Sequence, residues 1–365
     1  MDRHKKNKVV CLLFSMLLFG GLLLCICLPK DEFSESERRA LAPFPHLSVK
    51  SVSSGKFMSE FEKYATDAFP FRDSFRTLKA LTAEHLFCRQ DNNGIYAADG
   101  VLSAVEYPIN EASLERAAAR FRYVCEKYLT EENHVYFSVV PDKNCFLAQE
   151  SGHLCMDYAD FERRMQKHMD FAQYIRISDL LELSDYYRTD THWKQEKIVD
   201  VAVRMAQCMG ATTDTNYETH VTTQDFYGVY YGQAALPLAP DTLSFLTSDT
   251  LNRCTVYDGQ NERRIPVYDL ERAQGRDPYE LFLSGALSLV TIENSEADTD
   301  KRLVIFRDSF ASSLAPLLVG GYARITLVDI RYIHPDSLGE FVDFSESDVL
   351  FLYSTLVLNH SETLK

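Results

Sequence analysis

Several features are missing from this sequence of 365 residues, and each absence narrows its function. It has no internal repeat and no low-complexity tract, which argues against solenoid and fibrous architectures. It has no excess of basic charge: the net charge is −15, which argues against binding to nucleic acid or to anionic lipid. No C-x-x-C pair follows the first thirty residues, so zinc-ribbon chemistry is not expected.

The chain does contain one long apolar run. Val9 to Leu28 carries no charged side chain and follows Arg3, Lys5, Lys6 and Lys8. About 20 apolar residues are needed to cross a bilayer core. Because basic flanks stay in the cytoplasm, the run predicts a single-pass cell-membrane protein with a cytoplasmic N-terminus and an extracytoplasmic remainder.

A cleaved signal peptide is the alternative interpretation of the same segment. Signal peptides have apolar segments of about 7–15 residues that end at a small-x-small cleavage site. Here the run ends in Cys25-Ile26-Cys27-Leu28-Pro29-Lys30, which offers no such site. The pattern therefore favours an uncleaved signal anchor over residues 1–30, and cleavage remains the open alternative.

The cysteines leave the disulfide pattern undecided. Three of the nine lie in the apolar segment, and six follow it: Cys88, Cys125, Cys145, Cys155, Cys208 and Cys254. An even number in an exported domain permits disulfides. A domain of this length is also stable without them, so free thiols are an equal expectation.

Beyond the anchor we expect a stalk or arm over residues 31–75 and one large domain over 76–365. The arm is polar and punctuated by Ser and Pro, with a short amphipathic helix expected at Phe57–Tyr64. The stretch of about 213–258 is rich in Tyr and Thr and is interpreted as an insertion, plausibly a lid. Its aromatic residues at 226–231 fit hairpin packing or a sugar platform.

The large domain alternates between helical and strand patterns. This alternation predicts an α/β fold, with a parallel sheet covered by helices on both faces. In such sheets, functional sites form beyond the carboxyl ends of the strands. The predicted helices are Glu111–Tyr128, Phe161–Tyr174, His192–Met209, a short one from Ala311, and Ser337–Phe341. The predicted strands are His134–Val140, Ile175–Ile177, Leu303–Phe306, Arg324–Ile330 and Asp348–Tyr353, with a hairpin turn at Asp99-Gly100.

Two short motifs carry the groups of a serine-nucleophile site. Asp190 and His192 lie two residues apart, so on an extended segment both side chains point to one side. Ser309 follows an apolar strand, where α/β proteins expose a nucleophile. His192 is the candidate base, and Asp190 would fix its tautomer. Taken alone, each motif is also compatible with a surface loop or a helix N-cap.

Supporting groups are harder to assign from spacing. The backbone N–H groups of Ser309 and Phe310 are candidates for stabilising an oxyanion. Lys143, Asn144 and Arg307 are further candidates, although Arg307 could simply pair with Asp308. Trp193 could wall the imidazole or begin the following helix. No other His or Cys lies at ligand spacing from Asp190-x-His192, so we expect no metal and no cofactor.

With these residues the chain resembles the bacterial DHHW proteins and the related alginate O-acetyltransferases. Besides Asp190-Thr191-His192-Trp193 and Arg307-Asp308-Ser309-Phe310, matching segments are Glu37 to Pro45, Asp67 to Arg72, the Asp99-Gly100 hairpin, Pro141-Asp142-Lys143, Gly228 to Tyr231 and Asp329 to Tyr332. The resemblance implies a permuted SGNH-hydrolase domain with a triad of Asp190, His192 and Ser309. The chain departs from the pattern at Thr191, where many DHHW proteins carry a second histidine, and at Arg307, where glycine would be usual.

The resemblance implies an extracytoplasmic O-acetyltransferase that modifies a cell-surface polysaccharide through an acetyl-serine. It also implies a membrane-bound O-acyltransferase partner that supplies the acetyl group. We expect no separate carbohydrate-binding module after the predicted catalytic domain, so the domain itself or its partners would bind the glycan. A carbohydrate acetylesterase with the same triad and a non-catalytic envelope or glycan-binding protein are the alternatives, because no residue decides between water and sugar as acceptor.

Overall fold

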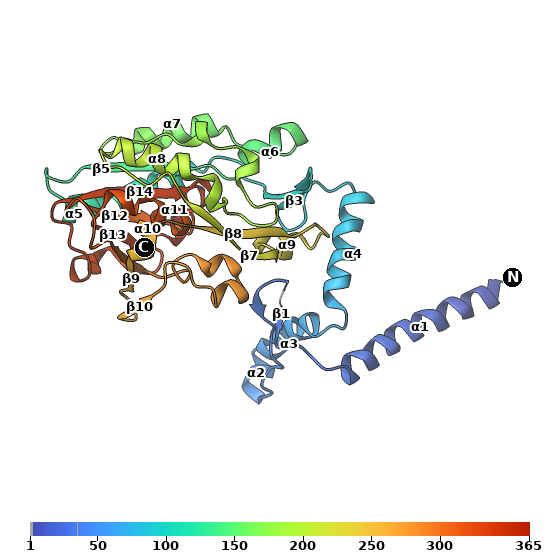
Figure 1. Ribbon diagram of the computed structural model, residues 1–365. Helices are drawn as coiled ribbons and strands as arrows, with labels where there is room; N and C mark the ends of the chain where they lie inside the picture. The colour runs from blue at the N-terminus through green and yellow to red at the C-terminus, as the bar shows by residue number, and fades with distance from the viewer. Residues whose placement is uncertain (1–2, 35) are drawn as a thin grey trace. The chain divides into compact units, whose positions relative to one another are not determined.

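The computed structural model describes residues 3–34 and 36–365, so Met1 and Asp2 of the expected cytoplasmic tip lie outside it. The chain divides into two compact units (Figure 1). The arm unit comprises the chain up to Asn92 together with Gly232–Pro237. The sheet unit comprises Asn93–Tyr231 and Leu238–Lys365.

The sheet unit is built on an eight-stranded sheet with the order β10-β9-β11-β13-β12-β14-β5-β6. The five strands from β13 to β6 run parallel, as the alternating pattern predicts. Strands β11, β9 and β10 continue the sheet antiparallel, which the sequence pattern did not predict. The strands are β5 (Val135–Val140), β6 (Gln173–Tyr174), β9 (Thr255–Asp258), β10 (Arg263–Ile265), β11 (Leu289–Glu293), β12 (Arg302–Arg307), β13 (Arg324–Val328) and β14 (Ser347–Ser354).

Helices cover both faces of this sheet, as expected. On one face α5 (Glu111–Tyr128), α7 (Tyr158–His168) and α12 (Thr355–Asn359) pack on side chains such as Val304 and Phe351. On the other face α8 (Val199–Cys208), α10 (Asp249–Arg253) and α11 (Ala311–Leu314) pack on Ile305 and Leu350. Alternate residues of the same strands serve the two cores, because successive side chains of a strand point to opposite faces.

The remaining elements of the sheet unit are short. The predicted hairpin is confirmed as β3 (Ile95–Ala98) and β4 (Val101–Ala104), with Asp99 and Gly100 both at positive φ in the turn. A second two-stranded sheet pairs β7 (Glu218–Phe226) with β8 (Asp241–Thr247). Two helices complete the set, α6 (Asn144–Ser151) and α9 (Val229–Ala234), and the last residues of α9 belong to the arm unit.

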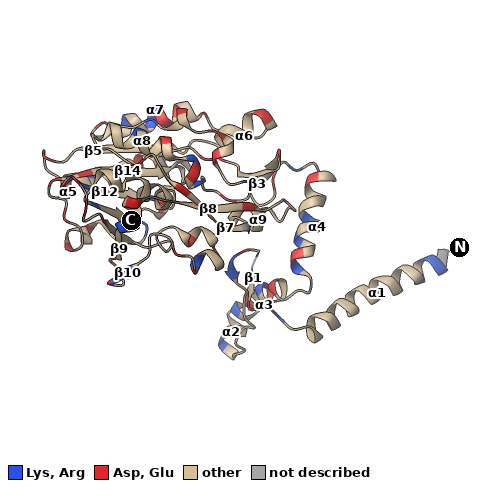
Figure 2. Cartoon of the chain, in the orientation of Figure 1, with Lys and Arg blue, Asp and Glu red and all other residues tan. Residues whose placement is uncertain are grey.

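The arm unit begins with α1 (Arg3–Cys27), the only described helix long and apolar enough to cross a membrane. Figure 2 shows charged residues only at its N-terminal end. The helix satisfies the length and composition of the predicted anchor, and a signal sequence would pass the same test.

Beyond α1, the arm unit holds a small two-stranded sheet and three helices. They are β1 (Phe33–Ser34), β2 (Arg39–Ala40), α2 (Val49–Ser53), α3 (Lys56–Asp67) and α4 (Arg72–His85). The predicted helix at Phe57–Tyr64 is therefore present and longer. Ion pairs join these pieces: Arg39 donates to both carboxylate oxygens of Asp67, at 2.8 and 2.7 Å, and Glu37 pairs with Arg72 and Arg76.

Three local predictions are wrong. Helix α7 ends at His168, and Gln173–Tyr174 of the predicted helix pair with β5 as strand β6, while Ile175–Ile177 follow that strand. The helix predicted from His192 begins only at Val199. The residues before it are held extended by tertiary contacts, among them the bridge between Tyr186 and Trp193 and the hydrogen bond from Lys194 N to Asp185 O.

The domain limits also differ from the expected ones. The expected boundary at residue 75 falls inside α4, and the compact units divide at Asn92 instead. The expected insertion of about 213–258 contains β7 and β8, but its last residues form β9 of the central sheet. Both differences come from long-range contacts, which local composition does not encode. All nine cysteines are described, and all are free thiols.

Candidate active site

The structure brings the two predicted motifs together at the carboxyl end of β12. The imidazole of His192 lies between the other two groups: Nδ1 is 2.6 Å from Asp190 Oδ1, and Nε2 is 2.7 Å from Ser309 Oγ. With the hydrogen on Nδ1, the imidazole donates to the carboxylate and accepts the hydroxyl hydrogen of Ser309. This is the hydrogen-bonding pattern of a serine triad. Asp190 and His192 are buried, and Ser309 is partly exposed.

Backbone donors hold the carboxylate of Asp190 in place. Its Oδ1 accepts from the N–H of His192 at 3.1 Å, and its Oδ2 accepts from the N–H of Val229 at 2.8 Å. The preceding Gly228 approaches so closely that an added Cβ would lie 2.2 Å from Asp190 Cβ. Only glycine permits this approach, so the segment first interpreted as a lid braces the carboxylate of Asp190.

The segment before Asp190 is also fixed. Thr189 donates its N–H and its hydroxyl to the buried carboxylate of Asp241, at 2.8 and 2.7 Å. The hydroxyl of Thr189 in turn accepts the N–H of Gly228 at 2.9 Å. Asp241 and Gly228 thereby clamp the Asp190–His192 loop from two sides.

Ser309 sits on a turn fixed by its neighbour Asp308. One carboxylate oxygen of Asp308 accepts the N–H of Phe310 at 3.0 Å, and the other accepts the N–H of Ser354 at 2.7 Å. Ser354 ends β14, the strand beside β12. The nucleophile turn is therefore tied to the carboxyl end of the neighbouring strand.

Trp193 links the two motifs. Its indole Nε1 donates to Ser313 Oγ at 2.9 Å and lies 3.2 Å from Phe310 O, and the whole side chain is buried. Trp193 therefore does not begin a helix. It anchors the loop of His192 to the helix that follows Ser309.

Tyr279 completes the site, although no sequence motif marked it. Its ring stacks on the imidazole of His192 at a centroid distance of 3.8 Å and an interplanar angle of 6°. Its hydroxyl lies 2.9 Å from Ser313 Oγ, the group that accepts the Trp193 N–H. Tyr279 thus covers one face of the imidazole and is itself held in place.

The predicted supporting residues have other partners. The N–H of Phe310 donates to the carboxylate of Asp308. Of the predicted pair of oxyanion donors, the N–H of Ser309 remains a candidate. Asn144 donates to backbone oxygens of Leu154 and Glu106 and accepts from Tyr96. Among the described residues, no hydrogen bond joins Asn144 to Ser309.

Arg307 is fully buried at the end of β12. It donates to Ser312 Oγ at 2.6 Å and to Leu287 O at 3.2 Å, rather than to the carboxylate of Asp308. Burial lowers the pKa of its guanidinium, and the negative charges of Asp329 and Asp308 oppose that effect. Arg307 braces the turn after β12 from behind.

Lys143 is also fully buried, behind the loop of the triad. Its ammonium donates to Tyr187 O at 2.9 Å and to Arg188 O at 3.2 Å, and it lies 5.1 Å from the ring centroid of Tyr230. Burial lowers the pKa of Lys143 to about 7, against the attraction of Asp190. In these contacts Lys143 positions the loop and does not reach the nucleophile.

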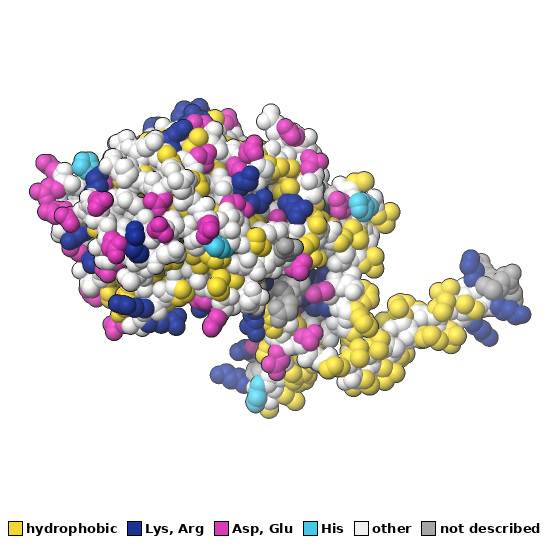
Figure 3. Space-filling model, viewed as in Figure 1, with side chains coloured by type: hydrophobic (Ala, Val, Ile, Leu, Met, Phe, Trp, Pro, Cys, Tyr) yellow, Lys and Arg dark blue, Asp and Glu magenta, His cyan; other side chains and the backbone are white. Residues whose placement is uncertain are grey.

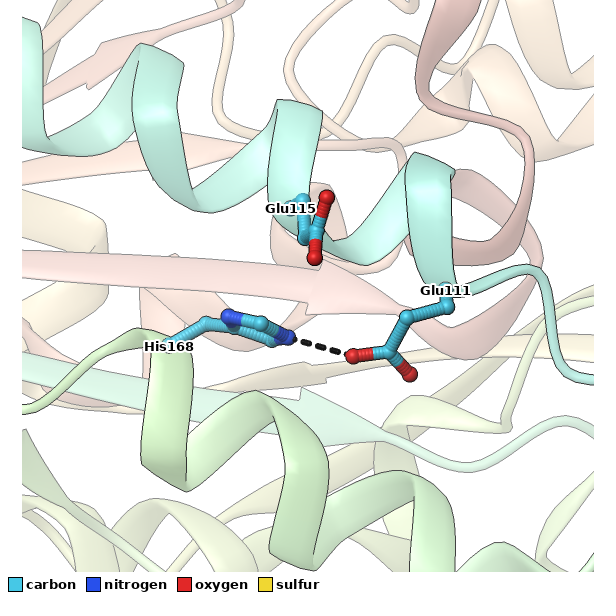
Figure 4. Close-up of side chains that lie close together, drawn as sticks. All are labelled: Glu111, Glu115 and His168. Carbon is cyan, nitrogen blue, oxygen red and sulfur yellow. Dashed lines mark hydrogen bonds and ion pairs between the residues drawn. The ribbon is translucent and has the colours of Figure 1, made fainter.

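One group of ligand-type side chains lies outside the triad. Ligand atoms of Glu111, Glu115 and His168 fall within 4.8 Å of one another (Figure 4). His168 Nε2 lies 2.8 Å from Glu111 Oε1, and Arg164 donates to the other oxygen of the same carboxylate at 2.7 Å. Ion pairing between α5 and α7 accounts for this group, so we assign it no metal.

The sheet order defines an α/β fold with a mostly parallel central sheet, and the turn that bears Ser309 follows β12. No protein-family model matches the sequence, and no curated protein matches it. Among solved structures, a DHHW family protein from Eubacterium siraeum shares the fold, with 19% identity and a TM-score of 0.60 over 75% of this chain and 95% of that one. The chain thus shares its fold with this DHHW family protein.

Two further proteins are similar. PatB1 of Bacillus cereus is 18% identical, with a TM-score of 0.56 over 74% of this chain and 98% of that one. Its structure with a sulfonyl adduct gives 17% and 0.54 over 72% and 97%. The O-acetyltransferase domain of Pseudomonas putida AlgJ is 14% identical, with a TM-score of 0.43 over 73% and 92%. At these identities, what the DHHW protein and PatB1 share with the chain is the fold.

Proposed function

We propose that the chain is an extracytoplasmic O-acetyltransferase of a cell-surface polysaccharide, with Ser309 as nucleophile, His192 as base and Asp190 as the orienting acid. The observation that carries the proposal is the unbroken hydrogen-bonded series from Asp190 through His192 to Ser309, at 2.6 and 2.7 Å. The identity of the acyl group and the kind of acceptor are inferred from the resemblance of the two motifs to those of the alginate O-acetyltransferases. α1 anchors the chain in the membrane.

The reaction proceeds in two halves at the same imidazole. In the first, Ser309 Oγ attacks the acetyl carbonyl carbon of the donor while His192 Nε2 takes the hydroxyl proton. The imidazolium returns that proton to the departing group, which leaves acetyl-Ser309. In the second, His192 takes the proton of a sugar hydroxyl, whose oxygen attacks the acetyl carbon, and Ser309 Oγ leaves and regains the proton. Asp190 stabilises the imidazolium in both halves.

The surroundings of the imidazole limit the directions from which an acceptor can approach it. Tyr279 covers one ring face and Phe310 lies on another side, with a centroid distance of 5.0 Å from the imidazole. An acceptor therefore reaches the base from the side of Nε2 and Ser309, and the resemblance to the O-acetyltransferases is what favours sugar over water. The proposed partner is a membrane-bound O-acyltransferase that delivers the acetyl group on the extracytoplasmic side of the membrane.

The direct test is acetyl transfer by the full-length protein in detergent, with 4-nitrophenyl acetate as donor and an oligosaccharide as acceptor. Ser309→Ala is expected to lower turnover by about a thousandfold or more. The exposed Ser345→Ala is the matched control and should keep wild-type turnover. Wild-type turnover by Ser309→Ala would contradict the assignment. Free acetate as the main product in the presence of acceptor would instead assign an esterase.

A second test follows from the sulfonyl adduct of PatB1. Treatment of this protein with a sulfonyl fluoride is expected to add one sulfonyl group, which peptide mass spectrometry should map to Ser309. Asp190→Asn should slow the labelling, because the imidazole loses its orienting acid. A folded protein that remains unlabelled would favour a non-catalytic, glycan-binding role.

A further inference from the structure

The arm unit carries an apolar groove that the proposed chemistry does not use. It lies between α3 and α4, has a volume of about 1040 Å³, and contains Met58, Phe61, Phe69 and Phe75 in its lining. Aromatic and aliphatic side chains continue beyond it on the same helices. Phe71 is 67% exposed and Phe75 is 52% exposed. Contiguous exposed apolar surface of this kind marks an interaction site.

The residues next to the groove indicate what it contacts. A second pocket, of about 590 Å³, is lined both by Leu24 and Leu28 at the end of α1 and by Phe69 and Phe71 in the turn between α3 and α4. Lys30 donates a hydrogen bond to the hydroxyl of Tyr64, and its ammonium lies 4.5 Å from the centroid of that ring. The turn from α3 to α4 therefore lies beside the point where α1 leaves the membrane.

The residues around the turn are those that proteins place at a membrane surface. Phenylalanine rings provide the apolar edge, and Lys30 and Lys79 provide cationic groups nearby. Amphipathic helices with this composition lie in the interface with their apolar face among the acyl chains. Apolar side chains are visible on both α1 and α4 in the space-filling view (Figure 3).

We propose that the turn between α3 and α4 inserts Phe69, Phe71 and Phe75 into the outer surface of the phospholipid bilayer that α1 crosses. The inference rests on α1 being an uncleaved anchor and is independent of the acyl-transfer proposal. The bilayer is the occupant that the structure favours, because the end of the apolar helix lines the same pocket as the aromatic turn. The arm would thus act as a second, interfacial contact next to the transmembrane helix.

The test uses the single tryptophan of the chain, Trp193, which is fully buried. Full-length Phe71→Trp is reconstituted in phosphatidylcholine vesicles with or without lipids brominated near the headgroup end of the acyl chains. Bromine quenches tryptophan on contact, and the wild-type protein gives the background from Trp193. We expect at least a twofold loss of the added emission at Phe71→Trp. The emission of the wild-type protein, which comes from the fully buried Trp193 alone, should lose none.

Leu23→Trp in α1 separates the two ways in which the inference can fail. Quenching at Leu23→Trp without quenching at Phe71→Trp would leave the anchor standing and overturn the interfacial arm. No quenching at either position would overturn the anchor and the arm together. If Phe71→Trp is unquenched and the protein self-associates in a way that Phe71→Asp abolishes, the groove binds a second copy, which also overturns the proposal. None of these outcomes depends on catalytic activity.

Discussion

The arm unit and the sheet unit treat apolar side chains in opposite ways. In the sheet unit, α5 buries Leu114, Phe121 and Val124 against strands, and α8 buries a comparable stripe on the other face. In the arm unit, α2 buries no residue and the only buried side chain of α3 is the carboxylate of Asp67. One unit is organised by two apolar cores. The other is joined by ion pairs and by contacts between rings such as Phe44 and Phe61, and several of its phenylalanines stay exposed.

This difference assigns different tasks to the two units. Because close packing fixes side chains in single rotamers, the sheet unit can hold Asp190, His192 and Ser309 at hydrogen-bonding distances. Surface ion pairs contribute little to stability, and the interfacial contact proposed above would supply the apolar contacts that the arm unit lacks. The following variants test this division in order of decreasing effect.

Two glycines four positions apart offer the sharpest comparison. In Gly228→Ala the new Cβ would collide with Asp190, whereas in Gly232→Ala it would lie 1.7 Å from Ser36 O in the arm unit. Gly228→Ala is expected to lower ester turnover by about a hundredfold or more, because small displacements of a catalytic group are costly. Gly232→Ala should stay within about twofold and show faster proteolysis between residues 31 and 92. Equal turnover by the two variants would refute the division.

Tyr279 tests how far the aromatic cover of His192 matters. Tyr279→Ala removes the stacked ring and is expected to lower kcat about tenfold, equivalent to about 1.4 kcal/mol. Tyr279→Phe keeps the ring and loses only the contact with Ser313, so it should recover most of that loss. Steady-state kinetics on an activated ester measures both variants. If Phe and Ala behave alike, the hydroxyl rather than the stacked ring is the important group.

Lys143 predicts a pH dependence of stability confined to the sheet unit. Its pKa is about 7 in the folded protein, below the ordinary value of 10.5. Between these values the unfolded chain binds a proton that the folded protein does not, so folding stability from this group rises with pH. Below about pH 7 the cost of burying the charge is complete. Urea unfolding from pH 6 to 9 should show wild type gaining stability relative to Lys143→Met, and a constant difference would contradict a depressed pKa.

The smallest expected effect concerns Asp67 in the arm unit. Hydrogen bonds from Arg39 lower the pKa of Asp67 to about 2, from 3.8. The stabilisation is therefore present above about pH 4 and is lost as the pH falls toward 2. Asp67→Asn should speed proteolysis of the arm a few-fold at pH 7, while the thermal unfolding of the sheet unit stays unchanged. Cooperative destabilisation of both units by this one change would contradict their independence.

The sequence predicted those parts of the molecule in which local pattern and tertiary structure agree. Helix α5 matches its predicted range because its apolar stripe, its Asn110 cap and its position over the sheet coincide. In the structure His192 lies within hydrogen-bonding distance of both Asp190 and Ser309, although only Ser309 follows a strand of the parallel sheet. Their catalytic roles remain a proposal.

The errors lie where distant contacts override local preference. Gln173–Tyr174 continue a helical pattern but pair with Tyr136 and Phe137. The antiparallel strands β9 to β11 carry no signal of their direction. Tyr279 has no motif, because its role depends on meeting His192 across 87 positions of sequence, and nothing in the surrounding residues encodes that contact. The sequence marks Gly228 as part of a motif. The reason for a glycine at this position becomes clear only once the position of Asp190 is known.

The order of the strands has a consequence for how the protein is made. β12, which ends at the turn bearing Ser309, lies between β13 and β14, and both of these follow it in the chain. During synthesis from the N-terminus, Asp190 and His192 emerge 117 residues or more before Ser309. The turn that bears Ser309 gains the hydrogen bond from Ser354 N–H to Asp308 only after residue 354 has been synthesised. A growing chain that has not reached residue 354 therefore lacks one of the two hydrogen bonds that hold the Asp308 carboxylate beside Ser309.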